Sequence, residues 1–265
     1  RESMIFNVRR MAIFTSSITL VAAIAGGASA ETLAGLTGDK SLVHIDTVAM
    51  KVTKTVELDA ALVGIDVRPI DGLLYGVTID GAIVTIDVMT GKTAKKSQVS
   101  EKVPAGMAIS VDFNPIADRM RLIAADGTSL RINVEDGKAT VDGRLKYADA
   151  DAMKATAPKA GAAAYTNSFA GTKETALYDI DVAAGTLVKQ APPNDGILNT
   201  VGKLGVAVDG GIAFDIQSDG KGGNAAWLIA GTTLHAVDLA TGAAKAIGQI
   251  AGLKGGLKDM AVLSK

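Results

Sequence analysis

The chain has no cysteine and only two histidines, and these two scarcities exclude several kinds of site. Without cysteine there is neither a disulfide framework nor a thiolate metal site. His44 and His235 leave little material for histidine-based catalysis or a histidine-rich zinc centre. Aromatic residues make up only 4% of the chain. The fold must therefore be held by burial of aliphatic side chains.

The chain also lacks an excess of charge of either sign. The 27 Lys and Arg residues nearly balance the 28 Asp and Glu residues. Such a chain has no basic footprint for nucleic acid, so we expect no nucleic-acid partner. The sequence shows neither a phosphate-binding loop nor a dinucleotide fingerprint, because its glycine pairs stand among turn residues rather than before helices. No Ser-His-Asp arrangement is visible either.

The beginning of the chain has the pattern of a signal peptide. Arg9 and Arg10 form a positive segment after Met4, and the apolar run 11–25 follows. This run is shorter than the ~20 residues that a membrane span needs. It ends in Ala28-Ser29-Ala30, a small-x-small cleavage site. We therefore expect residues 1–30 to be removed and 31–265 to form one domain, periplasmic or extracellular, with no membrane span after cleavage.

A short motif, in which Asp stands between two apolar residues, recurs along the rest of the chain. The copies are Ile65-Asp66-Val67, Val111-Asp112-Phe113, Phe214-Asp215-Ile216 and, less regularly, Lys258-Asp259-Met260 and Tyr165-Thr166-Asn167. Successive copies are 46, 54, 49 and 44 residues apart. Each interval holds four short apolar runs separated by Gly, Asp and Asn, and no long helical period is present. A repeat of this size made of four strands is typical of a β-propeller blade.

Counting these units predicts an all-β, five-bladed β-propeller with four-stranded antiparallel blades. Only one strand, 257–263, remains after Gly255-Gly256, whereas three strands precede the first complete unit, at 32–37, 41–47 and 51–58. One strand plus three makes the fifth blade, so we expect the C-terminal strand to pair with the N-terminal strands and close the ring. A β-sandwich is the main rival, but it predicts neither the period nor shared termini. We expect 147–159 to form a loop.

The same residues resemble a known family. The chain is similar to bacterial secreted proteins of the domain of unknown function 4394 family, which are β-propeller-like. The motifs that carry the resemblance are 33–37, 64–69, 74–76, 112–115 with 118–119 and 121, 164–167 with 169–171, 192–194 and 198–202. This resemblance implies the fold and the extent of the domain, and it carries over no catalytic residue.

In a propeller the innermost strands line a central channel, and the recurring Asp residues fall on these strands. Two interpretations stay open. The residues Asp66, Asp112, Asp215 and Asp259, with Thr166 on the remaining innermost strand, can surround the axis and hold a hard cation such as calcium. Alternatively each Asp accepts hydrogen bonds from backbone N–H groups of a neighbouring turn, and no metal or other cofactor is needed. We favour the second interpretation.

Residues near the strand ends are the candidates for ligand contact: Arg68, Asn114, Asn167 and Gln217. A second group, Arg119, Arg121 and Arg131, is either an anion site or a set of surface ion pairs with Asp118, Asp126 and Glu135. The two histidines are expected to pack in the core or between blades.

Three classes of function fit these features. The first, which we favour, is a non-catalytic binding module for a protein, a glycan or a small polar ligand. The second is a calcium-dependent hydrolase of the lactonase or glycosidase kind that uses axial carboxylates, by analogy with other propellers. The third is a structural protein of the envelope or matrix.

Overall fold

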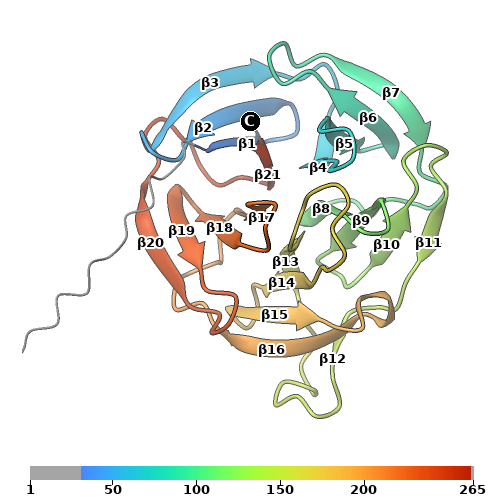
Figure 1. The fold of residues 1–265 in the computed structure, drawn as a ribbon, viewed down its shortest axis with the longest axis vertical. Helices are drawn as coiled ribbons and strands as arrows, with labels where there is room; N and C mark the ends of the chain where they lie inside the picture. The colour runs from blue at the N-terminus through green and yellow to red at the C-terminus, as the bar shows by residue number, and fades with distance from the viewer. Residues whose placement is uncertain (1–30, 264–265) are drawn as a thin grey trace, which may run out of the picture.

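The computed structural model describes residues 31–263, which form a five-bladed β-propeller (Figure 1). The expected signal peptide lies outside the described residues. Each blade is built on four antiparallel strands around a central axis, as the sequence predicted, and the fourth blade has one short additional strand. In the first blade the order from the axis outward is β21 (Asp259–Leu263), β1 (Thr32–Thr37), β2 (Ser41–Asp46) and β3 (Lys51–Glu57).

The second, third and fifth blades each use four consecutive strands, with the first of them innermost. The second blade contains β4 (Leu62–Val67), β5 (Leu74–Thr78), β6 (Ala82–Ile86) and β7 (Thr93–Gln98). The third contains β8 (Ile109–Asn114), β9 (Arg119–Ala124), β10 (Ser129–Ile132) and β11 (Ala139–Val141). The fifth contains β17 (Ile212–Ser218), β18 (Asn224–Ala230), β19 (Thr233–Val237) and β20 (Ala244–Gln249).

The fourth blade departs from the others. Its main strands are β13 (Ala160–Tyr165), β14 (Leu177–Asp181), β15 (Thr186–Gln190) and β16 (Ile197–Lys203). A short fifth strand, β12 (Lys146–Tyr147), pairs in parallel with β16 at the outer edge, which the sequence did not predict. The stretch after β12 consists of turns, and the short 3-10 segment η1 (Pro193–Asp195) follows a cis Ala191–Pro192 bond. Among the described residues no helix has the length and apolarity to cross a membrane.

The ring closes where the two ends of the chain meet. Strand β21 pairs antiparallel with β1, with Val262 opposite Leu33 and Met260 opposite Gly35. This pairing confirms the predicted closure. The C-terminal strand thereby becomes the innermost strand of the first blade, so that no blade is left with an open inner edge.

The hydrophobic core lies between the blades rather than inside any one of them. In one such layer, Tyr75 of the second blade packs edge-to-face on Phe113 of the third, with ring centroids 5.5 Å apart. Similar clusters join the other neighbouring blades. Each sheet is therefore buried on both faces, which explains why most inner strands are apolar in sequence.

Glycine is required where the outer turn of one blade meets the last strand of the blade before it. Gly91 and Gly137 both have φ of +74°. A Cβ atom would meet the carbonyl oxygen of Glu57 at Gly91 and that of Gln98 at Gly137. Ser100 N–H also donates to the Gly137 carbonyl, at 2.9 Å. The turn from Asp87 to Gly91 and its counterpart from Asn133 to Gly137 therefore form blade-to-blade contacts.

We expect Gly137→Ala to lower the free energy of unfolding by more than about 2 kcal/mol, because it adds a backbone clash to the cost of a left-handed residue. Gly72→Ala is the matched control: Gly72 has φ of +71°, but nothing lies within 4 Å of its added Cβ. It should cost about 1 kcal/mol. Urea unfolding of both variants measures the difference, and equal costs would contradict the blade contact.

Candidate functional site at the channel mouth

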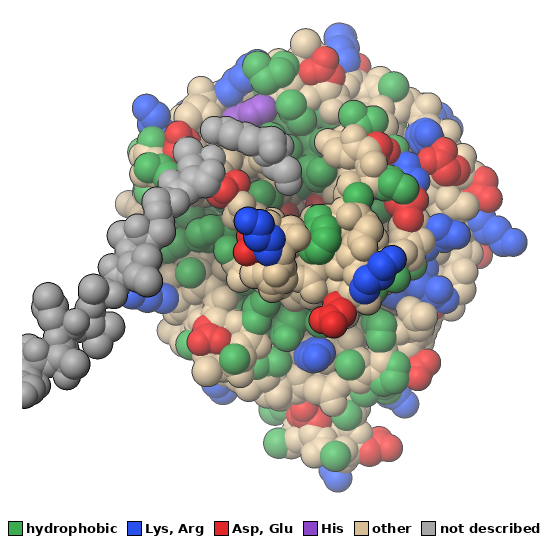
Figure 2. Space-filling model, in the orientation of Figure 1, with side chains coloured by type: hydrophobic (Ala, Val, Ile, Leu, Met, Phe, Trp, Pro, Cys, Tyr) green, Lys and Arg blue, Asp and Glu red, His purple; other side chains and the backbone are tan. Residues whose placement is uncertain are grey.

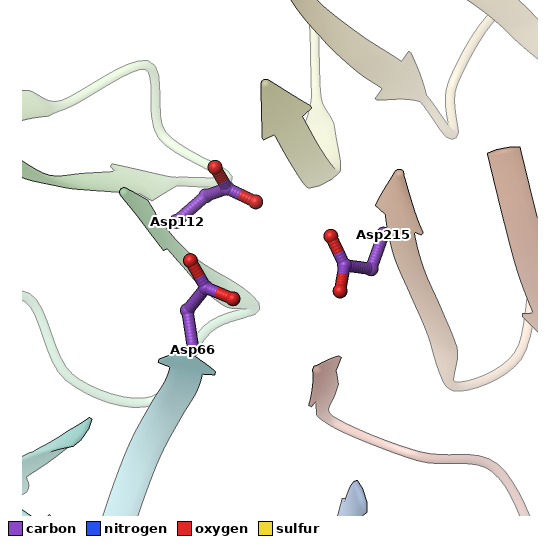
Figure 3. Close-up of side chains that lie close together, drawn as sticks. All are labelled: Asp66, Asp112 and Asp215. Atoms are coloured by element: carbon purple, nitrogen blue, oxygen red, sulfur yellow. The ribbon is translucent and has the colours of Figure 1, made fainter. Parts of the chain in front are cut away.

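Three carboxyl groups meet on the axis, and each comes from a different innermost strand. Asp66 comes from β4, Asp112 from β8 and Asp215 from β17, and an oxygen of each lies within 4.8 Å of the others. Figure 3 shows the three side chains pointing toward a common space from different sides. Each residue is at most 5% exposed, so the negative charges are held away from bulk water.

The same carboxyl groups connect neighbouring blades. Asp66 accepts the backbone N–H of Phe113 at 2.7 Å, and Asp112 accepts that of Tyr165 at 3.1 Å. Asp215 accepts the N–H of Val262 at 2.7 Å. These carboxyl groups therefore accept backbone N–H groups, as the bracing interpretation expected, but the donors lie on the next innermost strand and not in a neighbouring turn.

Asp259 does not join the group, and here the expectation from the repeat was wrong. Phe113, the residue after Asp112, donates its N–H to Asp66. Val262 donates its N–H to Asp215 in the same way, so the residue before it, Ala261, occupies the place that corresponds to Asp112. Asp259 therefore lies two residues deeper along the channel.

At that deeper level Asp259 has its own set of partners. Its Oδ2 accepts the N–H groups of Ile65 and Val111, both at 3.0 Å. Its Oδ1 lies 3.4 Å from the Ser110 hydroxyl. It thus joins the first blade to the second and the third.

Thr166 is displaced in the opposite direction. Tyr165 donates its N–H to Asp112 in the same way as Phe113 donates to Asp66. The residue before Tyr165, Ala164, therefore occupies the place of an axial Asp. The Thr166 hydroxyl accepts the N–H of Ala176 instead. The row of carboxylates therefore has gaps at the fourth and first blades.

Burial dominates the electrostatics of this cluster. It raises the pKa of Asp66 well above its usual value, and the nearby Asp215 carboxyl raises that pKa further. Burial also raises the pKa of Asp112, with Asp66 as the next cause, and that of Asp259. For Asp215 burial outweighs two backbone hydrogen bonds and raises the pKa to about 6. Among the described residues no cationic side chain forms an ion pair with any of the four.

A cavity of about 270 Å³ opens directly above the carboxyl groups. Asp66 and Asp215 form part of its floor, and Gln217, Ser168 and Phe169 are among its walls. In Figure 1 the loop that joins β13 to β14 reaches toward the centre of the ring. On the face seen in Figure 2 basic and acidic side chains are interspersed, without a broad surface of one sign.

Of the four residues expected to contact a ligand, Gln217 lines this cavity. Its Oε1 accepts a hydrogen bond from the Trp227 indole at 3.2 Å, which fixes the amide. Asn167, at φ of +54°, exchanges hydrogen bonds with Asn224 of the fifth blade. Asn114 accepts the N–H groups of the turn that follows it.

Arg68 is buried in an ion-pair network that is directed away from the cavity. It donates to Asp118 at 2.5 and 2.8 Å and to Glu135 at 2.7 Å. Its guanidinium also lies 5.7 Å from the ring centroid of Tyr75. Asp118 above all raises the pKa of Arg68, and Glu135 adds to this effect. The network links the second and third blades.

Arg121 is fully buried between the third and fourth blades, not on the solvent edge where its expected ion pairs would put it. It donates to Asp142 and Ser129, and across the blades to the Tyr165 hydroxyl and to Asn194. No repeat pattern in the sequence indicated Asp142 as its partner.

Both histidines are buried in the third strands of their blades, as expected. His44 Nε2 lies 2.7 Å from the carbonyl oxygen of Val88 on the next blade. His235 is 5% exposed.

The sequence also missed Asp179, a fully buried carboxyl on β14. Neither of its oxygens has a hydrogen-bond partner among the described residues. Burial raises the pKa of Asp179 to about 8. Its position in the uneven fourth blade gave no periodic signal.

Comparison with known proteins now identifies the class. The fold and the axial cluster are those of a five-bladed propeller with an acidic channel, and residues 41–261 match the model of a family described as Domain of unknown function (DUF4394). The chain belongs to this family. No curated protein matches it in sequence.

Several solved structures are similar to this chain at low sequence identity. A protein of unknown function from Bacteroides thetaiotaomicron VPI-5482 is 13% identical, with a TM-score of 0.51. The match covers 90% of this chain and 66% of that protein. One from Bacteroides caccae is 12% identical, with a TM-score of 0.42 and coverages of 84% and 74%. The dihydro-heme d1 dehydrogenase NirN is 14% identical, with a TM-score of 0.41 and coverages of 82% and 44%. The likeness to the Bacteroides thetaiotaomicron protein shows the fold alone.

The raised pKa values predict that the protein is more stable at mildly acidic pH than at pH 8. A carboxyl with a raised folded-state pKa keeps a proton that the unfolded chain has already lost, so stability falls as pH rises from about 4 through the folded pKa. For Asp215 the pH range over which stability falls ends near the folded-state pKa of about 6. A pKa that is one pH unit higher in the folded than in the unfolded chain corresponds to about 1.4 kcal/mol of stability. In melting temperature each kcal/mol is worth roughly 2–4 °C.

Asp112→Asn should flatten this pH dependence. The amide oxygen can still accept the Tyr165 N–H, while one buried negative charge is removed. Melting temperatures between pH 5 and pH 8 measure the slope, with Asp149→Asn, an exposed carboxyl outside the cluster, as the control. An unchanged slope in Asp112→Asn would show that the axial group does not titrate in this range.

Proposed function

We propose that this chain is an exported ligand-binding module whose ligand sits in the cavity at the channel mouth. The observation that carries the proposal is the cavity floor, where two buried carboxyl groups, Asp66 and Asp215, stand without a cationic partner among the described residues. A ligand that brings positive charge or hydrogen-bond donors would relieve their mutual repulsion. Export rests on the segment ending at Ala30, and the intact mass of protein recovered from the periplasm or medium tests it.

The size and walls of the cavity restrict the ligand further. About 270 Å³ is near the lower limit of small-molecule sites, so we infer a compact ligand or the end of a larger one. Gln217 and Ser168 supply orienting polar groups, and Phe169 supplies an apolar surface. None of these three residues belongs to the recurring Asp motif. The blades therefore present different side chains at the cavity, as a site for a single ligand requires.

A hard cation is one member of this ligand class. Oxygens of Asp66, Asp112 and Asp215 converge within 4.8 Å, which suits calcium or a similar ion. Each carboxyl would then have to give up its proton, because the cation replaces it. Hydrolysis is a second candidate function, since the pKa of Asp215 at the cavity wall, about 6, suits a general acid or base near neutral pH.

Thermal unfolding with three probes tests the binding proposal: calcium chloride, methylammonium chloride and mannose, which represent a hard cation, a compact organic cation and a polyol. At least one probe should raise the melting temperature progressively with concentration. The shift should be lost in Asp215→Asn and weakened in Gln217→Ala, while Gln249→Ala, an exposed glutamine away from the cavity, keeps it. No shift with any probe contradicts the proposal. Turnover of chromogenic lactones or glycosides that is lost in Asp215→Asn would favour hydrolysis.

A further inference from the structure

A second pocket, of about 160 Å³, lies on the third blade and is lined only by side chains that can donate hydrogen bonds. The lining residues are Arg119 on β9, Arg131 on β10, Asn133 and Lys138 in the following turn, and Thr140 on β11. Three of the five are cationic, and no carboxylate is among them. This pocket does not include any residue of the channel-mouth cavity.

The positive charge of the pocket is only partly compensated. Arg131 Nε donates to Asp142 at 2.7 Å, but the same carboxylate oxygen also accepts from Arg121 at 2.7 Å. One carboxylate thus serves two guanidinium groups. Arg119 donates to the backbone carbonyls of the turn before it, and neither Arg119 nor Lys138 forms an ion pair with any described residue.

Nearby acidic groups are already engaged elsewhere. Asp118 and Glu135 both bind Arg68, and Glu135 also binds Lys96 at 2.8 Å. Asp136 accepts the backbone N–H of Lys138 and is exposed to solvent. The carboxylates that could neutralise the pocket therefore do not do so.

The guanidinium groups are held in place before any ligand arrives. The Asp142 side chain is only 4% exposed, and its carboxylate fixes Arg131 through Nε. No described residue accepts a hydrogen bond from the terminal nitrogens of Arg131. Those nitrogens are left available for planar, paired recognition of an oxyanion.

The rest of the propeller does not need these cations. Strand register puts Leu73 and Thr85 of the second blade in the places of Arg119 and Arg131. The fifth blade has alanine at both places. The outer hairpin forms in all three blades, so the two arginines are not a requirement of the scaffold.

We propose that this pocket binds a tetrahedral oxyanion, either free phosphate or a phosphate or sulfate group carried by a larger ligand. Arginine and lysine nitrogens would bind the oxygens, with the Asn133 amide and the Thr140 hydroxyl as further donors. The volume of about 160 Å³ suits such a group and excludes a bulky ligand body from the pocket itself. This site is independent of the binding function proposed for the channel mouth.

Isothermal titration with inorganic phosphate, at ionic strength held constant with chloride, tests the site. Arg119→Gln and Lys138→Gln should each weaken binding about tenfold, the effect of removing one charged donor. Lys92→Gln is the matched control, because Lys92 occupies the place of Lys138 in the second blade and should leave binding unchanged. Unchanged melting temperatures show that the variants are folded.

Absence of saturable phosphate binding, or equal binding by the parent and both pocket variants, would overturn the proposal. Asp112→Asn should bind phosphate as the parent does, so that a failure here is distinguishable from a failure at the channel mouth. Glucose 6-phosphate separates the two sources of the anion. Tighter binding than inorganic phosphate supports a group carried by a larger ligand, and equal binding supports the free ion.

Discussion

The five innermost strands surround the axis without pairing with one another, so side chains must join them there. Buried backbone N–H groups near the axis need acceptors, and an aspartate carboxyl is short enough to reach the next strand. Asp66 joins the second blade to the third, Asp112 the third to the fourth, and Asp215 the fifth to the first. The fourth and fifth blades are joined by Asn167 and Asn224 at the mouth instead.

This arrangement has an electrostatic cost that the described part of the chain does not offset with cations. Burial of several acids around one axis raises their pKa values, and each charge makes the next harder to form. The cluster therefore has two requirements. Its oxygens must accept backbone hydrogen bonds to hold the ring together, and its carboxyl groups must keep protons or bind a positive ligand to avoid mutual repulsion.

Much of the fold could be predicted from the sequence because each blade repeats one local pattern. The number of blades, the closing strand and most strand limits follow from the recurring Asp motif and from short apolar runs separated by Gly, Asp and Asn. The register of Asp259 and Thr166 could not be predicted in this way. Side chains on a strand alternate with a period of two, so a two-residue slip keeps the same face toward the axis and leaves the pattern unchanged.

Long side chains explain why the two arginines lie elsewhere than the sequence predicted. Arg68 shares the channel-facing row in sequence, yet its guanidinium reaches Asp118 on the next blade. Arg121 likewise meets Asp142, far from any repeat of its own motif. Such pairings depend on how neighbouring blades pack, which a local pattern does not contain. Of the residues that line the mouth, only Gln217 was expected to contact a ligand, and the two aspartates were expected on the axis.

The central claim is that burial around the axis raises the pKa of the axial carboxyl groups above that of an exposed aspartate. Infrared spectroscopy of the carboxylic-acid carbonyl stretch, followed from pH 4 to pH 8 in the parent and in Asp112→Asn, tests it most directly. We expect the protonated-carboxyl band of the parent to persist to higher pH than the band of exposed aspartates and to be weaker in the variant, with the buried Asp179 contributing equally to both. Loss of the whole band near pH 4 in both proteins, as for exposed carboxyl groups, would contradict the claim.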